Sequence, residues 1–369
     1  MRMFRRREEA RRALGAWHFA LPLTLSLLGL VLLYSTTYTG AWLPSRMVWM
    51  QLLWLAAGIA VYFLLARVRV GVRPASFHLF FFPIEGLLIL TLLVGWAVHG
   101  SRRWLKLGEL TVQPSEFAKV FAILLLAYFL TDYLRSEEGQ RFFAAVGVMA
   151  ALAVPILLQP DLGTAMVFLL LLLVILWVKP FPRRYLVGIV AALVLVAVPG
   201  WFMLRDYQQA RIMAFLHPAR DILGTGYHVH QSKIAVGSGG VWGKGLLQGT
   251  QTQGQFIPVQ AADFIFATAG EEWGLLGSLF VLGLFAAFFA KTAQLARRVR
   301  TDYARLIAYG VLAVIFFQLF INVGMTMGLM PVTGLPLPFL SYGGSSMLTM
   351  WALCGLLASL QRHLPGARV

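Results

Sequence analysis

Residues 17–38 read WHFALPLTLSLLGLVLLYSTTY, a stretch without a single Asp, Glu, Lys or Arg. A helix needs about 20 predominantly apolar residues to cross the hydrocarbon core of a bilayer, and this stretch is long enough. No small-residue cleavage site follows the apolar run, so we expect a retained anchor and not a secretory leader. The stretch therefore predicts a membrane-spanning helix near the beginning of the sequence.

The same pattern recurs along the whole chain. Hydrophobic residues make up 59% of the 369 residues and charged residues 12%, whereas a soluble domain carries roughly 25% charged residues. We therefore expect an all-α polytopic membrane protein in which residues 1–369 form one domain with about ten transmembrane helices. The predicted spans are Trp17–Tyr38, Met47–Ala66, Phe77–Val98, Ser115–Thr131, Phe142–Leu158, Gly163–Val178, Tyr185–Leu204, Phe264–Ala290, Tyr303–Leu329 and Tyr342–Leu360.

The distribution of Lys and Arg predicts the topology. Basic residues accumulate on the cytoplasmic side of membrane proteins, and an even number of spans places both termini on one side. If the tail of residues 1–16 is cytoplasmic, most of the 31 Lys and Arg residues also fall on that side. We therefore expect both termini in the cytoplasm, and we interpret the formal charge of +16 as a topology signal and not as a sign of nucleic-acid binding. The single cysteine, Cys354, excludes a disulfide framework.

Some basic residues lie on the outer side, against this bias. In the short outer segment His99–Pro114 they are Arg102, Arg103 and Lys106, and in the large extracytoplasmic loop, residues 205–262, they are Arg205, Arg211, Arg220, Lys233 and Lys244. Two interpretations are open, namely binding of an anionic ligand or contact of solvated loops with lipid headgroups. The large loop is too polar to span the membrane, and its length marks it as a functional candidate, so we expect an ordered cap.

Several charged residues fall within or next to predicted spans, where burial of a charge costs roughly 2.5–3.5 kcal/mol. Glu116 and Lys119 share a helix face, so they either pair with each other or contact a ligand. Asp161 and Asp263 each stand at the start of a span, where an aspartate either caps the helix or belongs to a site. Glu271 follows Asp263 by about two helical turns. We expect these residues to meet in one cavity at the outer face, beside the basic residues.

A glycine-rich run, a proline-rich segment and one further glutamate are the remaining polar features of the sequence. The run Gly237–Gly245 resembles a phosphate loop only superficially, because Ser238 replaces a required glycine and Gly245 replaces the Ser or Thr that holds magnesium. Its backbone N–H groups still make it a candidate anion contact. Prolines interrupt the segment Val332–Gly344, and non-helical backbone at membrane depth survives only against protein or a wet cavity, so this segment predicts a wall of the same cavity. Glu85, in the inner half of the third span, has no explanation in this scheme.

A set of motifs in one order resembles the SEDS family (shape, elongation, division and sporulation), most closely its RodA branch. The motifs are Arg103-Trp104, residues 113–119 (QPSEFAK), 159–164 (QPDLGT), Tyr207-Gln208 with Arg211, 224–227 (GTGY), 231–235 (QSKIA), 243–245 (GKG), 249–251 (GTQ), 263–266 (DFIF), Glu271-Glu272, Asn322, Gly324, Pro331, 334–338 (GLPLP) and 341–345 (SYGGS). The chain departs from the family before Asp263, where Val259 and Ala262 stand in place of the usual glutamate and threonine.

The resemblance implies an inverting glycosyltransferase that polymerises lipid II into glycan strands. It places the reaction at the outer face of the bacterial cytoplasmic membrane, during cell elongation and the maintenance of rod shape. The implied partners are a class B penicillin-binding protein, bound through transmembrane helices, and other membrane proteins of the elongation complex. The small-xxx-small pair Gly283 and Ala287 suits either the partner's helix or internal packing.

By resemblance, Asp263 is the catalytic residue, and a general base, a metal ligand and a helix cap are its competing roles. The diphosphates of donor and acceptor are expected to bind Arg103, Lys119, Arg211, Lys233 and Lys244, with Glu116, Asp161 and Glu271 in support. A divalent cation, Mg²⁺ or Mn²⁺, is a candidate cofactor with Asp161 and Asp263 as ligands, and no nucleotide or organic cofactor is expected. The alternative functions are a lipid II flippase, because spans broken by prolines also suit transport, and a scaffold for a synthase.

Overall fold

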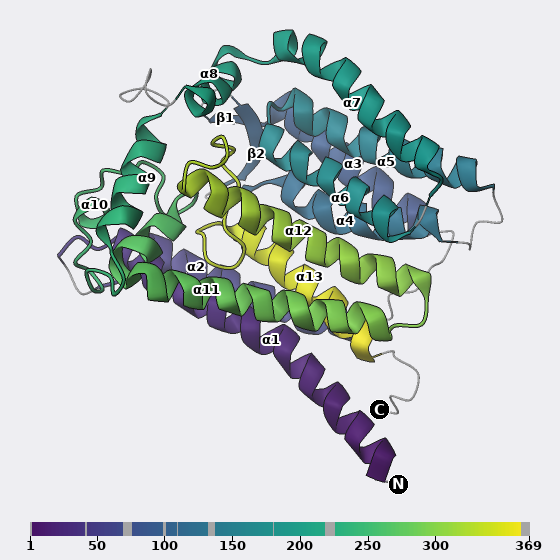
Figure 1. Ribbon diagram of the computed structural model, residues 1–369, viewed down its shortest axis with the longest axis horizontal. Helices are drawn as coiled ribbons and strands as arrows, with labels where there is room; N and C mark the ends of the chain where they lie inside the picture. Colours follow the sequence, from purple (N-terminus) through teal and green to yellow (C-terminus); the bar gives the residue numbers. More distant parts are fainter. Residues whose placement is uncertain are drawn as a thin grey trace.

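Most of the long helices pack side by side into one bundle, and the helix Arg183–Met203 lies at its margin (Figure 1). The computed structural model describes residues 2–40, 43–68, 76–98, 101–108, 110–131, 137–179, 181–217 and 226–362. Arg220 and the start of the GTGY motif lie outside these residues. The long helices are α1 (Arg2–Thr36), α2 (Arg46–Arg67), α3 (Ser76–Val94), α4 (Pro114–Leu130), α5 (Glu138–Leu158), α6 (Leu162–Val178), α7 (Arg183–Met203), α11 (Ile265–Arg298), α12 (Asp302–Thr326) and α13 (Gly344–Arg362).

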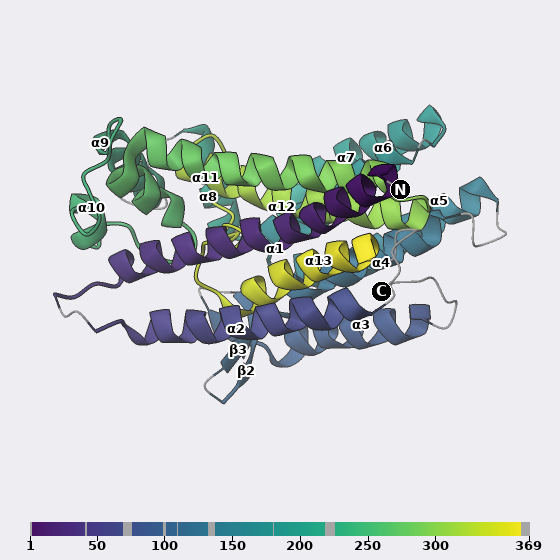
Figure 2. The same ribbon diagram turned by 90° about the horizontal axis from the view of Figure 1, so that it is seen from below.

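Each predicted span falls on one of these helices, because a helix is the structure that satisfies every backbone group of an apolar segment internally. Five are long and apolar enough to cross a membrane, namely α1 from Ala16, α2, α5, α11 and α12, and Phe81–Val94 of α3 and α6 are shorter apolar helices. The chain is therefore a mainly helical, multi-pass membrane protein. The beginning of α1 and the end of α13 lie at the same end of the bundle, opposite the cap helices α9 and α10 defined below (Figures 1 and 2).

The prediction of an all-α protein is wrong in one detail, the short outer segment. Helix α3 ends at Val94, and a three-stranded antiparallel sheet follows, made of β1 (Trp96–Val98), β2 (Ser101–Leu107) and β3 (Leu110–Val112). The predicted span to Val98 is therefore too long. Pairing of Leu105 with Val112 and of Leu107 with Leu110 supplies hydrogen-bond partners to a backbone that has left the helix.

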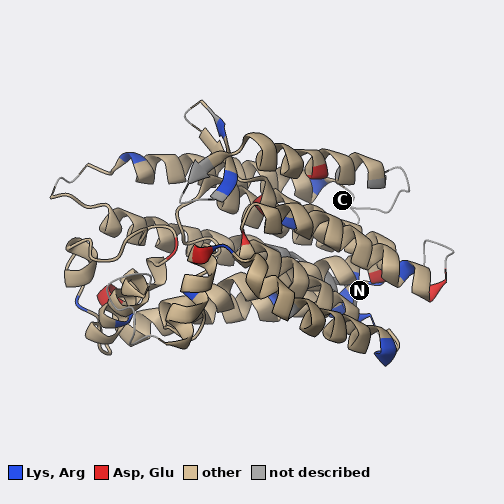
Figure 3. Ribbon diagram, turned by 90° about the horizontal axis from the view of Figure 1, so that it is seen from above, with Lys and Arg blue, Asp and Glu red and all other residues tan. Residues whose placement is uncertain are grey.

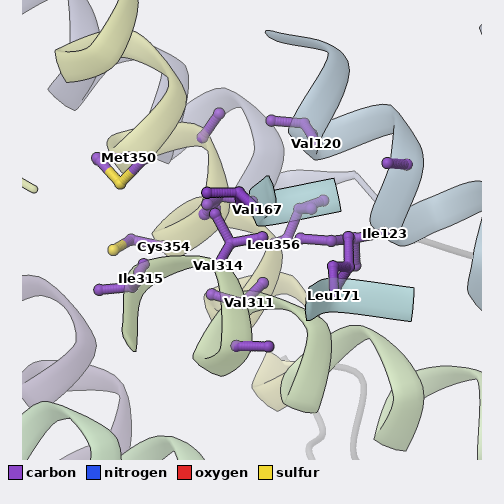
Figure 4. Packing of buried hydrophobic residues seen from close by; sticks show 14 of the residues in the cluster. Val120, Ile123, Val167, Leu171, Val311, Val314, Ile315, Met350, Cys354 and Leu356 are labelled. Atoms are coloured by element: carbon purple, nitrogen blue, oxygen red, sulfur yellow. The ribbon is translucent and has the colours of Figure 1, made fainter. Parts of the chain in front are cut away.

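One part of the buried core lies where α4, α6, α12 and α13 meet. Figure 4 shows Val120 and Ile123 of α4 close to Val167 and Leu171 of α6, with Val311 and Val314 of α12 beside them. These side chains are buried. Lys, Arg, Asp and Glu are sparse along the bundle and gather mainly toward its ends and around the strands and cap (Figure 3). The bundle is thus an apolar frame whose charged groups lie mainly at its two ends.

The large loop contains the cap helices α8 (Asp206–Leu216), α9 (Tyr227–Ser238) and α10 (Thr250–Gln253). The glycine-rich run after α9 packs into a break in α11 at Gly274, where φ is 66°. The backbone N–H groups of Lys244 and Gly245 donate to the carbonyls of Glu271 and Glu272, each at 3.0 Å. A Cβ on Gly243 would lie 2.2 Å from the Glu272 carbonyl oxygen, so only glycine fits there. The N–H groups of Lys244 and Gly245 are therefore taken up by the broken helix, and the anion contact predicted for this run does not use them.

Candidate functional site

Asp263 lies just before the first turn of α11 and is half-buried. Its N–H donates to the Val259 carbonyl at 3.0 Å, and its own carbonyl accepts from Asn322 Nδ2 at 2.8 Å. Phe264, not Asp263, occupies the N-cap position of α11, and no side-chain cap bond is made there. The structure therefore fixes the backbone of Asp263 from two sides, one residue before the N-cap position.

The segment Val332–Gly344 borders Asp263, as expected for a cavity wall. At Gly334 φ is 74°, and a Cβ there would lie 3.5 Å from Asp263 Oδ2. Glycine at this position thus permits the left-handed turn and leaves the carboxylate uncrowded. Asn322 Nδ2 also donates to the Leu335 carbonyl at 2.7 Å, so one buried amide ties this wall to the Asp263 backbone.

Arg103 and Asp161 meet next to this wall. Arg103 Nη1 lies 3.5 Å from Asp161 Oδ1, and Arg103 Nη2 donates to the Pro160 carbonyl at 2.6 Å. Asp161 caps α6 by accepting from the N–H of Thr164 at 3.1 Å and from its hydroxyl at 2.9 Å. Gln113 Nε2 donates to Asp161 Oδ2 at 3.2 Å. The two Gln-Pro motifs, at 113 and 159, therefore converge on one carboxylate that both caps a helix and holds Arg103.

Arg211 of α8 is the cation at the centre of the site. Its guanidinium lies 5.6 Å from the centre of the Tyr207 ring and donates to the Val332 carbonyl at 3.4 Å. The Tyr207 hydroxyl in turn donates to the Pro160 carbonyl at 3.0 Å. Burial and then the positive charge of Arg103 lower the pKa of Arg211, against the opposing pull of Asp263 and Asp161. An arginine stays protonated nonetheless, so an anion bound here relieves an unfavourable charge.

Two hollows adjoin at Arg211, Pro331 and Val332. The first hollow contains about 450 Å³ of open space and is lined by Arg103, Tyr207 and Thr333 among others. The second hollow contains about 590 Å³ and is lined by His230 and Lys233 among others. Lys233 is exposed, and among the described residues no hydrogen bond or ion pair reaches its ammonium group. Arg103, Arg211 and Lys233 are thus brought together as predicted.

Two other predicted anion contacts, Lys119 and Lys244, do not line these hollows. Lys119 Nζ lies 2.5 Å from Glu116 Oε1, and both side chains are buried. Lys244 Nζ lies 2.7 Å from Glu271 Oε1. Glu271 also accepts from the N–H groups of Gln251 and Thr252 at 2.8 and 2.9 Å. Each lysine is therefore held by a carboxylate, and the expectation that both line the anion surface is corrected.

A divalent cation fits this arrangement poorly at Asp161. Donors from Thr164, Gln113 and Arg103 already surround its two oxygens. Within the ranges that the structure describes, no group of three or more His, Cys, Asp or Glu side chains is placed to hold a metal ion. Glu85 of α3 stays without a role, because its described surroundings offer it no hydrogen bond or ion pair.

Some residues of the site were missed by sequence reasoning. Tyr207, Asn322 and Gln113 appeared only within motifs, yet each bonds a residue of the site. A buried amide within a span, such as Asn322, was a usable signal, because an unsatisfied amide at that depth is costly. His230 gave no such signal, since its place in the second hollow depends on the fold of the cap.

Known proteins resemble this chain over most of its length. It is 34% identical to the peptidoglycan glycosyltransferase RodA of Treponema pallidum (strain Nichols), over 92% of this chain and 95% of that protein. It is 36% identical to the peptidoglycan glycosyltransferase MrdB of Escherichia coli (strain K12), over 84% of each. Among solved structures, the chain matches one chain of a peptidoglycan synthase complex that coordinates polymerization and crosslinking. The TM-score is 0.77 and the identity 31%, over 94% of this chain and 97% of that one. The family model of the FtsW, RodA and SpoVE cell cycle proteins matches residues 16–365, and the chain therefore belongs to that family.

Proposed function

We infer that this protein is a peptidoglycan glycosyltransferase that polymerises lipid II into glycan strands, with a RodA-like role in cell elongation. Relatives that match most of the chain carry that activity in their names. One observation in the structure carries the inference further. Two basic hollows meet at Arg211, whose charge interacts with the half-buried Asp263, and the reaction needs places for two lipid diphosphates and one base.

Asp263 is the general base of the proposed reaction. The 4-hydroxyl oxygen of the acceptor sugar attacks the anomeric carbon of the donor while the bond from that carbon to the diphosphate oxygen breaks. Asp263 takes the hydroxyl proton, and such proton transfer contributes about 10²–10⁴-fold. Attack from the face opposite the leaving group inverts the anomeric configuration. The diphosphate departs with its bonding electron pair, so cations are needed where it leaves.

Arg211 and Lys233 supply the positive charge that the diphosphates need, with Arg103 next to them. Charge-assisted hydrogen bonds to phosphate are roughly twice as strong as neutral ones. Arg211 lines both hollows, so it contacts whichever diphosphate is bound. Lys119 and Lys244 take no part, because their carboxylate partners already neutralise them.

A divalent cation, if the reaction uses one, is bound by Asp263 together with the substrate's own phosphate oxygens. Asp161 is excluded from that role because its oxygens already accept from Thr164 and Gln113. Such an ion would stabilise charge on the departing diphosphate. The roles of base and metal ligand compete for the same two oxygens of Asp263.

The protein lies in the bacterial cytoplasmic membrane with the hollows at the outer face and both termini in the cytoplasm. It crosses the membrane about ten times, with the loop of residues 205–262 as its cap, in one domain. Its partner is a class B penicillin-binding protein, in line with the synthase complex that contains the similar chain. Other membrane proteins of the elongation complex associate with this pair.

Gly283 on α11 is the candidate contact for the partner's helix. It is exposed, and a Cβ there would have no atom within 4 Å, so internal packing does not use this glycine. Gly283→Leu should therefore fold as the parent does but recover less partner on co-purification. Parental recovery of the partner by the folded variant would remove Gly283 from the interface.

The function is tested by giving the purified protein and its partner lipid II and a divalent cation in detergent. Glycan strands on a gel are the expected product, and only a polymerase makes them. Absence of strands, with lipid II instead crossing the membrane of protein-containing vesicles, would establish the flippase. Absence of both activities would establish the scaffold.

A further inference from the structure

Gln51 is a buried amide inside the membrane-spanning part of α2. Only 1% of its surface is exposed, and a polar side chain at this depth is unfavourable unless both ends of the amide are satisfied. Gln51 Nε2 donates to the Ser341 carbonyl at 3.0 Å, and the Gly343 N–H donates to Gln51 Oε1 at 3.1 Å. One side chain of α2 thus holds the turn that leads into α13, the helix that packs along α2 (Figure 2).

The same turn holds the segment just before Asp263. The Ser341 hydroxyl donates to the Ala262 carbonyl and accepts from the Leu337 N–H at 2.8 Å. The Tyr342 N–H donates to the Ala261 carbonyl at 2.9 Å. A continuous chain of hydrogen bonds therefore runs from Gln51 through the turn to the two residues that precede Asp263.

The turn does not hold its shape by local preference. Phe339 has a φ of 66°, an unfavourable value for a bulky side chain. Such a conformation persists when its surroundings over-determine it. Phe339 is buried against Phe288 and Trp351, and the Gln51 amide secures the backbone on its C-terminal side. Loss of that amide frees the turn to relax away from Ala261 and Ala262.

We propose that Gln51 is a positioning residue for catalysis, which sets the place of the Asp263 carboxylate through the turn Ser341–Gly343. The proposal rests on the proposed role of Asp263 as the base. Gln51 touches neither the two hollows nor the cations around them. Its loss should therefore lower kcat and leave the KM for lipid II unchanged. A displacement of about 1 Å in a catalytic group costs roughly 10²-fold in rate, so we expect a fall of about 10- to 100-fold for Gln51→Leu.

Gln318 of α12 provides a matched control. It is also fully buried in a span, and in the part of the chain that the structure describes neither of its amide atoms forms a hydrogen bond. Gln318→Leu makes the same change of side chain at a comparable depth without touching the turn. It should polymerise lipid II with parental kcat and KM.

Ser341→Ala tests the next link, because it removes the hydroxyl between Leu337 and Ala262. It should also lower kcat at constant KM. Residues that act through one element are not additive in a double-mutant cycle. Gln51→Leu combined with Ser341→Ala should therefore be little worse than the more damaging single change, while Gln51→Leu combined with Gln318→Leu should equal Gln51→Leu alone.

The measurement is the initial rate of glycan formation against lipid II concentration, with the full chain and its partner in detergent. Parental kcat for Gln51→Leu, an equal loss for Gln318→Leu, or additivity with Ser341→Ala would each overturn the proposal. If Gln51→Leu does not accumulate as folded protein, Ser341→Ala tests the proposal by itself. A lower kcat at constant KM would support it, and a parental kcat would overturn it. Asp263→Asn, run in parallel, separates the two ideas, since activity in that variant would refute the base itself.

Discussion

Two groups of basic residues that the sequence predicts at the outer face look alike in the sequence and behave differently in the structure. The hollow cations are Arg211 and Lys233, which line open space and form no ion pair with any described carboxylate. The clasped lysines are Lys119 and Lys244, which lie 2.5 and 2.7 Å from Glu116 and Glu271. The fold thus separates cations that stay open to a ligand from lysines that a carboxylate already holds.

The largest effect is expected at Asp263, beside the hollow cations. Asp263→Asn keeps the shape of the side chain and removes its charge and basicity, so lipid II polymerisation should fall by about 10²–10⁴-fold. The variant should still reach the membrane, bind its partner and melt near the parental temperature. Near-parental glycan synthesis on a gel would show that Asp263 is not the general base.

Lys119→Met tests the clasped group. It leaves the Glu116 carboxylate buried without its partner, and removal of one member of a buried pair costs about 3–5 kcal/mol. Thermal unfolding in detergent should show a large loss, and the double variant Glu116→Gln/Lys119→Met should recover part of it. Lys233→Met is the matched control, since the same change at an exposed lysine should shift stability by no more than about 0.5 kcal/mol. Equal melting of Lys119→Met and the parent would mean that the clasp does not stabilise the fold.

Arg211→Gln and Lys233→Gln test the hollow cations. Hydrogen bonds to charged groups contribute about 1.5–3 kcal/mol, so each change should weaken lipid II binding by about tenfold or more. Added salt should weaken the parent more than the variants, because part of the attraction is Coulombic. Lipid II binding measured in detergent at two ionic strengths gives both the affinity of each variant and its dependence on salt. Unchanged affinity in both variants would contradict the assignment of the two hollows to diphosphates.

The smallest effect is expected for Lys244→Met. Glu271 loses one donor but keeps the N–H groups of Gln251 and Thr252, so the loss of stability should be about 1.5 kcal/mol, the lower end of the range for one hydrogen bond to a charged group. Lipid II affinity should stay at the parental value, in contrast to Lys233→Gln. A tenfold loss of affinity without a loss of stability would place Lys244 among the hollow cations.

The sequence by itself determined where the long apolar helices lie. A long apolar run has one stable form in lipid, because only an intra-segment helix satisfies its backbone, and this rule needs no knowledge of neighbours. It also pointed to Asp263, Arg103 and Arg211, through motifs in a constant order. It failed at Trp96–Val98, where strand pairing replaced the predicted end of a span.

Only the tertiary structure decided which charges are used by the fold and which stay open to a ligand. Glu116 and Lys119 are neighbours on one helix, so their spacing in the sequence already indicated that they could pair. Glu271 and Lys244 come from different segments, and the glycine run at the break of α11 brings them together. Gln51 lies far from Asp263 in the sequence, and its effect passes through the turn at Ser341. Contacts of this kind depend on how helices pack, and spacing along a chain does not encode the distance between helices.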